Sequence, residues 1–396
     1  MSNAQTQLEI ITDPEAFRAL QSDWDALWSR ANGRHHQAFA VCWLCWLHVA
    51  QPAGRQLRCI VCREHGKLVM VWPLVTYRQV FWTLLRPLTP DTAEHTSILL
   101  DDEVCAPEMI ASACRAATRL SGADVFLAPY LSEGSHLHDV VRQQAGAVFL
   151  ERDIAPMAKL RDETDWDTFC STLGRLSGRK PGARERRLAK EGRVAVRLLS
   201  SESAEEYATC VDWLLACKRE WAQRTGKKGA WLYSPAYRDF LINLLRPAQG
   251  DAMARLFVVT LDEAPVAALI AGIGKSCIVE LISGFDAAYS AFSPGSIAIE
   301  HFVKWTLQQR KDLDFGVGSE SFKAYWSRDN IVVTHSFRIA NTRWGLVAIR
   351  ANEAAKIFKR RISDLRSILR QTKRLNVSDG LSSEDKAMER TSANAD

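Results

Sequence analysis

The pattern of hydrophobic and polar positions changes its period several times along this chain, and each period indicates one kind of secondary structure. Between residues 14 and 31, large apolar side chains recur at the spacing of an amphipathic helix, whereas shorter apolar runs bounded by polar turns indicate strands. Over the first 150 residues the pattern predicts helices at 14–31, 39–50, 108–120 and 135–144, and strands at 8–13, 57–63, 68–77 and 123–127. This alternation predicts a mixed α/β unit.

A second, similar unit begins after residue 153. Strands are predicted at 154–160, 194–199, 254–261, 265–273, 276–283 and 313–315, and helices at 203–224, 235–245 and 296–309, with Thr164 or Asp165 capping a further helix. Because a helix crosses between strands 276–283 and 313–315, we expect these two strands to be parallel neighbours. The predicted organisation is a lobe at 1–153, a lobe at 154–350, and a basic amphipathic helix with a disordered tail at 351–396.

Length and composition fit such a two-lobed globular chain. A chain of 396 residues is too long for one hydrophobic core of ordinary size. Its composition, with 47% hydrophobic and 24% charged residues, is typical of globular proteins. The longest apolar run, at 38–49, is shorter than the roughly 20 residues that cross a bilayer. No basic segment followed by an apolar one opens the chain, so we expect a cytoplasmic protein.

Four of the ten cysteines have the spacing of a zinc ribbon, with Cys42 and Cys45 followed by Cys59 and Cys62. The first pair lies in a predicted helix and the second in a predicted strand. Residues three apart on a strand point to opposite faces, so both sulfurs of the second pair would not reach one metal ion. We therefore expect buried cysteines and no metal site.

The net charge of +5 is concentrated in two places. Eight lysines and arginines lie between residues 175 and 193, and a second cluster covers 356–374. Such clusters indicate phosphates, anionic lipid or nucleic acid as partners, or else solvated helix faces. We expect residues 353–374 to contact an anionic membrane peripherally, at its inner face, and do not expect nucleic acid as a partner.

Several short motifs of the second lobe occur in a familiar order. They are Trp221, GFD at 284–286, Tyr289, SPG at 293–295, DFGVGSE at 314–320 and Lys323. On these marks, residues 166–326 resemble the BioF2-like acetyltransferase family, which includes CelD/BcsL-type proteins associated with polysaccharides. That family is similar to the Fem-type peptidyltransferases, which have two lobes of the GCN5-related N-acetyltransferase (GNAT) type. The first lobe matches more loosely, through VWPL at 71–74 and PLTP at 87–90.

The resemblance implies a fold and a reaction. The expected fold class is α/β, with α+β mixed sheets, in a tandem GNAT-like two-lobed arrangement. The implied reaction moves an acetyl or longer acyl group from acyl-CoA to an amine or hydroxyl of a small-molecule or saccharide acceptor, first of all an exopolysaccharide or cell-envelope precursor. Two alternatives stay open: a Fem-like transferase that uses aminoacyl-tRNA, and a non-catalytic accessory protein of polysaccharide synthesis.

The segment FSPGS is the predicted donor site. GNAT enzymes hold the pyrophosphate of CoA at a glycine-rich loop before a helix; that loop is absent here, and FSPGS lies in its place. A helix N-terminus offers free N–H donors to a phosphate. Ser293 is a candidate N-cap, Pro294 suits the first turn, and Gly295 lets the backbone approach a phosphate beside Ser296. The alternative is an ordinary capped helix.

Acyl transfer needs a base for the attacking group and dipoles for the developing oxyanion. Candidate bases are Glu280, Asp286 and Asp314, and Asp314 would alternatively anchor the following glycine turn. Lys323, three residues after Glu320, is a candidate for pairing with that acid, for neutralising a phosphate or for polarising the acyl carbonyl. Tyr325 is a candidate acid or a packing residue. We expect Asp286 and Asp314 to share one cleft with Lys323 opposite.

Two further residues are candidates for acceptor contacts. Trp221 and Arg224 lie at the end of a predicted helix, directly before a loop. A large aromatic ring beside a guanidinium at such a position suits substrate binding, and core packing is the alternative for Trp221.

Overall fold

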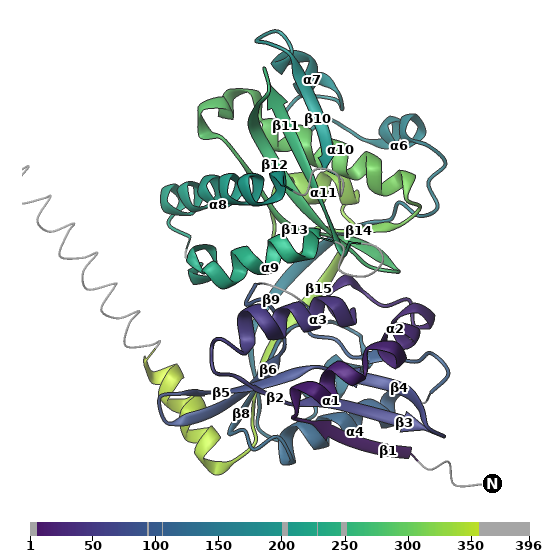
Figure 1. Ribbon diagram of the computed structural model, residues 1–396, viewed down its shortest axis with the longest axis vertical. Helices are drawn as coiled ribbons and strands as arrows, with labels where there is room; N and C mark the ends of the chain where they lie inside the picture. Colours follow the sequence, from purple (N-terminus) through teal and green to yellow (C-terminus); the bar gives the residue numbers. More distant parts are fainter. Residues whose placement is uncertain are drawn as a thin grey trace, which may run out of the picture. The chain divides into compact units, whose positions relative to one another are not determined.

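The computed structural model describes residues 6–92, 95–104, 106–199, 205–227, 229–246 and 252–355 (Figure 1). The chain forms two compact units, Met1–Asn341 and Thr342–Asp396. In the second unit, residues 343–355 are helical. The predictions for 356–396, which include most of the basic helix and the tail, lie outside the described residues, as does the predicted helix start at residue 203.

The first part of the chain builds a small antiparallel sheet with a helical cover. The sheet has the order β1-β3-β4-β7, formed by β1 (Thr6–Ile11), β3 (Cys59–Glu64), β4 (Lys67–Trp72) and β7 (Leu99–Leu100). Between β1 and β3 come α1 (Pro14–Ala19), α2 (Gln21–Arg30), α3 (Phe39–Cys45) and a π-helical turn, η2 (Trp46–Ala50). The side chain of Asp13 accepts a hydrogen bond from the Ala16 N–H (2.8 Å), which fixes where α1 begins.

A second sheet of eleven strands runs through most of the unit 1–341. Its order is β10-β11-β12-β13-β14-β9-β15-β8-β6-β5-β2. The strands are β10 (Val194–Leu199), β11 (Ala254–Leu261), β12 (Ala264–Ile273), β13 (Cys277–Phe285), β14 (Asp312–Asp314), β9 (Ala147–Ala158), β15 (Ile331–Ala340), β8 (Val125–Ser132), β6 (Trp82–Pro87), β5 (Leu74–Gln79) and β2 (Gln56–Leu57). The predicted lobe boundary at 153/154 falls inside β9, so β9 and β15 are common to both lobes; below, the first lobe is residues 6–146 and the second lobe 159–330.

Helices cover both faces of the second-lobe strands. α8 (Glu206–Thr225) and α9 (Pro235–Leu245) pack on one face, and α6 (Trp166–Thr172), α7 (Ala183–Leu188) and α10 (Pro294–Gln308) contribute to the core on the other. Along β11, Leu256 and Val258 belong to the first of these cores, and Phe257 and Val259 to the second, as the alternation of a strand buried on both faces requires. The remaining helical elements are α4 (Ala106–Arg119), α5 (His136–Arg142), α11 (Ser321–Ser327), η1 (His35–Gln37), η4 (Ala230–Tyr233) and η5 (Ala287–Phe292).

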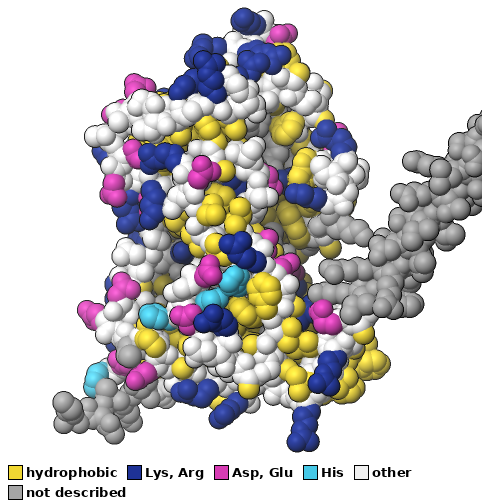
Figure 2. Space-filling model, turned by 180° about the vertical axis from the view of Figure 1, so that it is seen from behind, with side chains coloured by type: hydrophobic (Ala, Val, Ile, Leu, Met, Phe, Trp, Pro, Cys, Tyr) yellow, Lys and Arg dark blue, Asp and Glu magenta, His cyan; other side chains and the backbone are white. Residues whose placement is uncertain are grey.

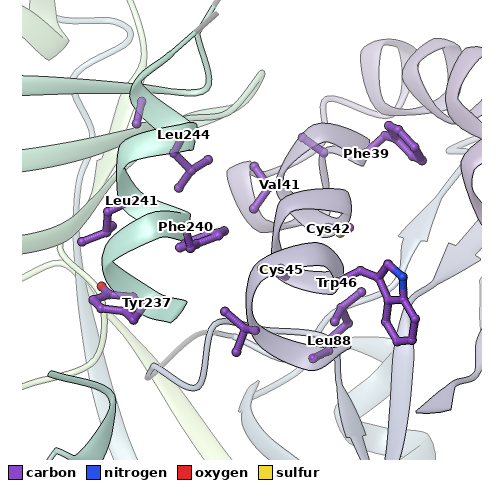
Figure 3. Packing of buried hydrophobic residues seen from close by; sticks show 14 of the residues in the cluster. Phe39, Val41, Cys42, Cys45, Trp46, Leu88, Tyr237, Phe240, Leu241 and Leu244 are labelled. Atoms are coloured by element: carbon purple, nitrogen blue, oxygen red, sulfur yellow. The ribbon is translucent and has the colours of Figure 1, made fainter. Parts of the chain in front are cut away.

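One hydrophobic core is shared by the two lobes. It includes residues of α3 and η2 from the first lobe and of α8 and α9 from the second. Figure 3 shows Phe240 and Leu244 of α9 on the side that faces Val41 and Cys45 of α3, and all four are buried. Burial stabilises each large side chain by about 1.5–3 kcal/mol, so this contact holds the lobes together.

The loop that follows α2 is held tightly against the second lobe. The Lys275 N–H donates to the Gly33 carbonyl (2.8 Å), and the indole N–H of Trp28 donates to the Arg34 carbonyl (2.9 Å). The ring of His35 lies so close to Gly272 on β12 that a β-carbon there would be 2.7 Å from it. Burial of His35 lowers its pKa to about 4, so the ring is neutral in this contact.

The predicted elements are largely confirmed, with corrections where the chain bends. β10, β11 and α9 have the predicted bounds, and β13 and β14 are parallel neighbours as expected. The predicted helix 14–31 is divided at Leu20 into α1 and α2. The predicted strand 68–77 is divided at Pro73, which lacks an N–H for the ladder, and its halves, β4 and β5, belong to different sheets. The strands β6, β7 and β15 were not predicted.

The four cysteines with zinc-ribbon spacing are buried in hydrophobic cores. Cys59 belongs to the core shared by the lobes, whereas Cys62 belongs to the core under α4 and α5, so they lie on opposite faces of β3 as expected. Cys42 donates to the His36 carbonyl at 3.3 Å. Among the described residues, no group of three or more His, Cys, Asp or Glu side chains is placed to hold a metal ion.

Replacing Gly272 with alanine should destabilise the protein by about 1–3 kcal/mol, because the added methyl group would overlap the His35 ring. Urea unfolding measures the effect. Gly174→Ala is the matched control, since a β-carbon at 174 meets nothing within 4 Å. The double variant Gly272→Ala/His35→Ala should lose less stability than the two single variants lose together. Equal stability of Gly272→Ala and the control would mean that the loop is not clamped.

Candidate functional site

The eleven-stranded sheet opens between β13 and β14. The two strands pair in parallel only from Cys277↔Asp312 to Val279↔Asp314, after which β14 ends and β13 continues. On the other side of β13, the register with β12 skips Leu281, which marks a β-bulge. The bulge turns the strand over: Ile278 belongs to the core under α10, while Ile282 belongs to the core under α8 and α9. In a regular strand these residues would share a face.

Two cavities adjoin at this opening. The interlobe cavity, about 220 Å³, is lined by both lobes: Arg34, His35, His36, Pro90, Thr92, His95, Lys218, Trp231, Tyr237, Phe240, Leu241, Cys277, Val279, Glu280, Leu281, Ile282, Ser283, Asp314, Phe315, Gly316, Val317, Glu320 and Lys323. The α10 cavity, about 340 Å³, is lined by Lys218, Trp221, Glu280, Ser283, Gly284, Phe285, Ser290, Ser293, Gly295, Ser296, Ile299, Glu320, Phe322 and Lys323. Their common wall is formed by Lys218, Glu280, Ser283, Glu320 and Lys323.

Glu280 lies at the bulge, on the wall that the two cavities share. Its Oε1 accepts a hydrogen bond from the Ser283 hydroxyl (2.7 Å), whereas its buried Oε2 has no hydrogen-bond partner within the described part of the chain. Burial raises the pKa of Glu280, and the charges of Lys323 and Lys218 only partly oppose this. A carboxylate with a raised pKa and one unused oxygen is suited to accept a proton.

Two lysines stand beside Glu280. The Nζ of Lys218 lies 4.3 Å from the centre of the Trp221 ring, and burial lowers the pKa of Lys218. Lys323 is almost wholly buried; its Nζ lies 3.3 Å from the Glu320 carboxylate and donates to the Val317 carbonyl (3.2 Å). The predicted pairing of Lys323 with a neighbouring acid is therefore present, and both ammonium groups face the junction of the cavities.

Asp314 ends β14 inside the interlobe cavity and is only 3% exposed. Its Oδ1 accepts the Gly316 N–H (2.8 Å), and its Oδ2 lies 3.3 Å from His95 Nε2 and 3.8 Å from Arg34 Nη1. Burial alone would raise the pKa of Asp314, but His95, Arg34 and the Gly316 N–H together lower it to about 2. The glycine-turn contact is the structural role that the sequence left open for this residue.

Asp286 is separated from that cavity. Its side chain caps η5 by accepting the Ala288 N–H (2.9 Å), and it lines neither cavity. The expected shared cleft therefore holds Asp314 and Lys323 but not Asp286, because the cap at the end of β13 occupies the Asp286 carboxylate.

Two other predicted residues also lie away from the cavities. The Tyr325 hydroxyl donates to the Gly174 carbonyl (3.4 Å), and its ring packs against Trp326. Arg224 forms an exposed ion pair with Glu220 at 3.7 Å. Trp221 does line the α10 cavity, so of the two residues predicted for acceptor contacts only the tryptophan faces a cavity.

The FSPGS segment begins α10 at the wall of the α10 cavity. Ser293 holds the N-cap position with φ 56°, in the left-handed region, and its hydroxyl makes no capping hydrogen bond. Pro294 occupies the first turn as predicted. Gly295 and Ser296 line the cavity, and a β-carbon at Gly295 would lie 3.0 Å from the Phe285 ring. Close packing and access to the first turn both favour glycine here.

Sequence reasoning missed Arg34, His36, His95 and Lys218. The first three belong to the first lobe and reach the cavity only through the packing of the lobes. His36 hydrogen-bonds Ser97 (2.7 Å), and burial lowers its pKa well below the ordinary value. The helical spacing of α8 indicated an amphipathic helix but did not show that Lys218 ends beside Glu280.

The basic stretch 175–193 is partly structural. Arg184 is buried and donates to the Leu176 carbonyl (2.6 Å). Arg187 donates to the Ala291 carbonyl (2.9 Å), and its guanidinium lies 5.1 Å from the centre of the Phe292 ring, so α7 packs on η5 just before α10. Figure 2 shows basic side chains gathered at the end of the second lobe where α7 lies.

The described part of the chain has no helix long and apolar enough to span a membrane. The predicted membrane contact of 353–374 falls almost entirely outside it.

Comparison with known proteins gives one matching family model. Residues 179–324 match the acetyltransferase (GNAT) domain. A search of curated proteins found no match. The resemblance to CelD/BcsL-type proteins therefore stays a prediction.

Among solved structures, FemX is similar with a TM-score of 0.54 and 13% identity, covering 85% of this chain and 98% of that one. A tandem GNAT protein from the clavulanic acid biosynthesis pathway gives 0.48 and 11%, covering 85% and 99%. The C-terminal domain of a putative lysylphosphatidylglycerol synthetase from Agrobacterium fabrum gives 0.49 and 12%, covering 85% and 96%.

At such low identity a structural likeness shows the fold alone. The family match and the similarity to FemX agree with the mixed sheets. Residues 179–324 of the second lobe thus match the acetyltransferase (GNAT) domain, and the chain has the predicted tandem GNAT-like fold of mixed α and β structure.

Proposed function

We propose that this protein transfers an acyl group from acyl-CoA to an amine or hydroxyl acceptor, with the donor in the α10 cavity and the acceptor in the interlobe cavity. The proposal rests mainly on the position and surroundings of Glu280. Its unpaired, buried carboxylate oxygen lies in the wall where the two cavities meet, at a strand bulge in a GNAT domain. Bulges are over-represented beside active sites, and a raised pKa is what a general base needs.

The residues of this wall suit acyl transfer. The acceptor nitrogen or oxygen attacks the thioester carbonyl, Glu280 takes its proton, and the carbon–sulfur bond breaks as the new bond forms. Lys323 stabilises the negative charge that develops on the carbonyl oxygen. Lys218, whose pKa burial lowers, returns a proton to the departing thiolate. Tyr325 has no part in these steps, since it lines neither cavity.

The α10 cavity suits the pyrophosphate of the donor. The first turn of α10 presents backbone N–H groups and the positive end of a fifteen-residue helix. The Ser293 hydroxyl is not used as a cap, so it is available to a phosphate. The glycine-rich loop of other GNAT enzymes is missing, and Gly295, which has no side chain, lines the α10 cavity in the first turn of α10.

Asp314 serves as a positioning residue in this proposal. With a pKa of about 2 it is ionised but weakly basic, whereas Glu280 has the higher proton affinity. The Asp314 carboxylate lies 3.3 Å from His95 and 3.8 Å from Arg34 in the interlobe cavity, where its charge attracts the Arg34 guanidinium. An exopolysaccharide or cell-envelope precursor remains the first acceptor to test, on the resemblance to CelD/BcsL-type proteins alone.

A second candidate donor is aminoacyl-tRNA. The basic α7 packs on η5, directly before the α10 cavity, so cations stand near the proposed phosphate site. Phosphate contacts of this kind give strongly salt-dependent binding. The same titration tests both donors.

Gly295→Glu should weaken acetyl-CoA binding at least tenfold, about 1.4 kcal/mol, because it adds bulk and negative charge at the start of α10. Isothermal titration calorimetry measures it. Gly174→Glu, which adds the same charge in open space, should bind like the wild type.

Unchanged affinity in a folded Gly295→Glu variant would remove the donor site. Salt-dependent binding of aminoacyl-tRNA without acetyl-CoA binding, lost in Arg186→Ala/Arg187→Ala/Lys190→Ala, would establish the second candidate instead. Binding of neither donor would leave the accessory role.

Glu280→Gln should lower turnover by about a hundredfold or more and leave acetyl-CoA affinity unchanged. Its melting temperature should equal or exceed that of the wild type, since a buried charge is removed. In the wild type, turnover should fall as pH drops through the raised pKa of Glu280, above 4.5, and the variant should lack this limb. Glu220→Gln, at an exposed ion pair, is the control. Wild-type turnover in Glu280→Gln would exclude this base.

Asp314→Asn should destabilise the protein by roughly 2 kcal/mol at pH 7. The folded-state pKa lies below the ordinary 3.8, so the ionised group stabilises the fold above that pH, and the contribution is lost as pH falls towards about 2. Urea unfolding at pH 7, 5 and 3 should therefore show a shrinking difference from the wild type. Exposed Asp167→Asn should be nearly neutral. A stable Asp314→Asn variant would contradict the anchoring role.

A further inference from the structure

We infer that the first lobe selects the acceptor, and that Arg34 binds a carboxylate on it, so that the substrate is an amine carrying a carboxylate at its far end. The inference rests on the proposed function, because it assigns the interlobe cavity to the acceptor. Beyond the proposed function, it names the class of acceptor and assigns its recognition to the first lobe.

The backbone of Arg34 is fixed, which places its side chain. Its carbonyl accepts the Trp28 indole N–H (2.9 Å), and its N–H donates to the Gln37 side chain (2.8 Å). On either side, Gly33 bonds Lys275 of the second lobe and His35 packs against Gly272. A loop held at every residue presents its one long side chain to the cavity with little freedom to reorient, which favours specific binding.

The guanidinium of Arg34 has donors to spare. Within the described residues it makes no hydrogen bond, and its nearest acid, Asp314, is 3.8 Å away, beyond hydrogen-bond distance. That carboxylate already accepts the Gly316 N–H, and it lies 3.3 Å from the His95 ring. Only 32% of the Arg34 side chain is exposed, so a part-buried fork of five N–H donors is left for a ligand. Such a fork matches a carboxylate, which it binds through two parallel hydrogen bonds.

His95 adds a second unpaired group in the same cavity. Its ring is 7% exposed, and its Nδ1 has no hydrogen-bond partner among the described residues. A buried, unsatisfied ring nitrogen costs free energy that a ligand polar group would recover. Arg34 and His95 thus form one polar region of the cavity, beside Asp314.

The proposed base lines the same cavity, together with apolar side chains. Glu280 stands at the junction with the α10 cavity, and Phe240, Leu241 and Leu281 also line the interlobe cavity. An acceptor that fits has its amine at Glu280, a hydrocarbon middle and an anionic end at Arg34. A simple alkylamine would fill the cavity but leave the Arg34 guanidinium without a partner. The enzyme should therefore prefer the amino acid over the alkylamine.

The test compares matched acceptors that differ only in the anion. Acetyl-CoA is offered with glycine, 4-aminobutanoate, 6-aminohexanoate and 8-aminooctanoate, and with the alkylamines that carry a methyl group in place of each carboxylate. Thiol release gives kcat/KM. The wild type should prefer at least one amino acid over its alkylamine by tenfold or more. Arg34→Met should bring that ratio near one, and Arg34→Lys, which keeps the charge without the fork, should fall between. Arg224→Met, an arginine outside both cavities, should keep the full preference.

The outcomes separate this inference from the function beneath it. Equal use of acid and alkylamine by the wild type, or a preference that survives Arg34→Met, overturns the inference and leaves the acyltransferase standing. Absence of both acetyl-CoA binding and thiol release overturns the function itself. If acetyl-CoA binds but no acceptor in the series reacts, the binding of the same compounds is measured by calorimetric titration in the presence of CoA. Binding that needs both the carboxylate and Arg34 supports the inference, and its absence overturns it.

Discussion

The site depends on one contact, the packing of α9 against α3 in the core that the two lobes share. Phe240 lies in that core and also lines the interlobe cavity, so the same side chain joins the lobes and shapes the site. The contact brings a first-lobe loop over β12, and without it Arg34, His36 and His95 would not reach the end of β14. A hydrophobic interface therefore determines the electrostatics of a polar cavity.

Two carboxylates on neighbouring strands show how far surroundings decide chemistry. Asp314 pairs with Val279 in the register, directly before Glu280. Both are desolvated, but Asp314 has a histidine, an arginine and a backbone N–H within reach, and its pKa falls, while Glu280 keeps an oxygen unpaired and its pKa rises. Pairs of acids with pKa values pushed apart are how one protein separates a fixed charge from a proton acceptor.

Most helices and strands of the second lobe could be predicted from the sequence, but few residues of the site could. The periodicity of apolar residues predicted the bounds of β10, β11 and α9, because each of these elements buries a regular stripe of side chains. The crossing helix α10 gave the parallel pair β13 and β14. Asp286 was misplaced because an acid after a strand suits a cap as well as a cleft. Arg34 and His95 carry no local signal, since their role arises from contacts with residues more than two hundred positions away.

The position of β15 has a consequence for how this chain is made. β15 lies between β9 and β8, so a strand from residues 331–340 completes a sheet whose neighbours end by residue 158. During synthesis from the N-terminus, β8 and β9 emerge with the place between them empty, and they wait for some 170 further residues. Long-range pairing of this kind slows folding and leaves strand edges open to wrong partners. The two lobes should mature as a single cooperative unit, and cutting the gene between them would leave each half without a strand that it needs.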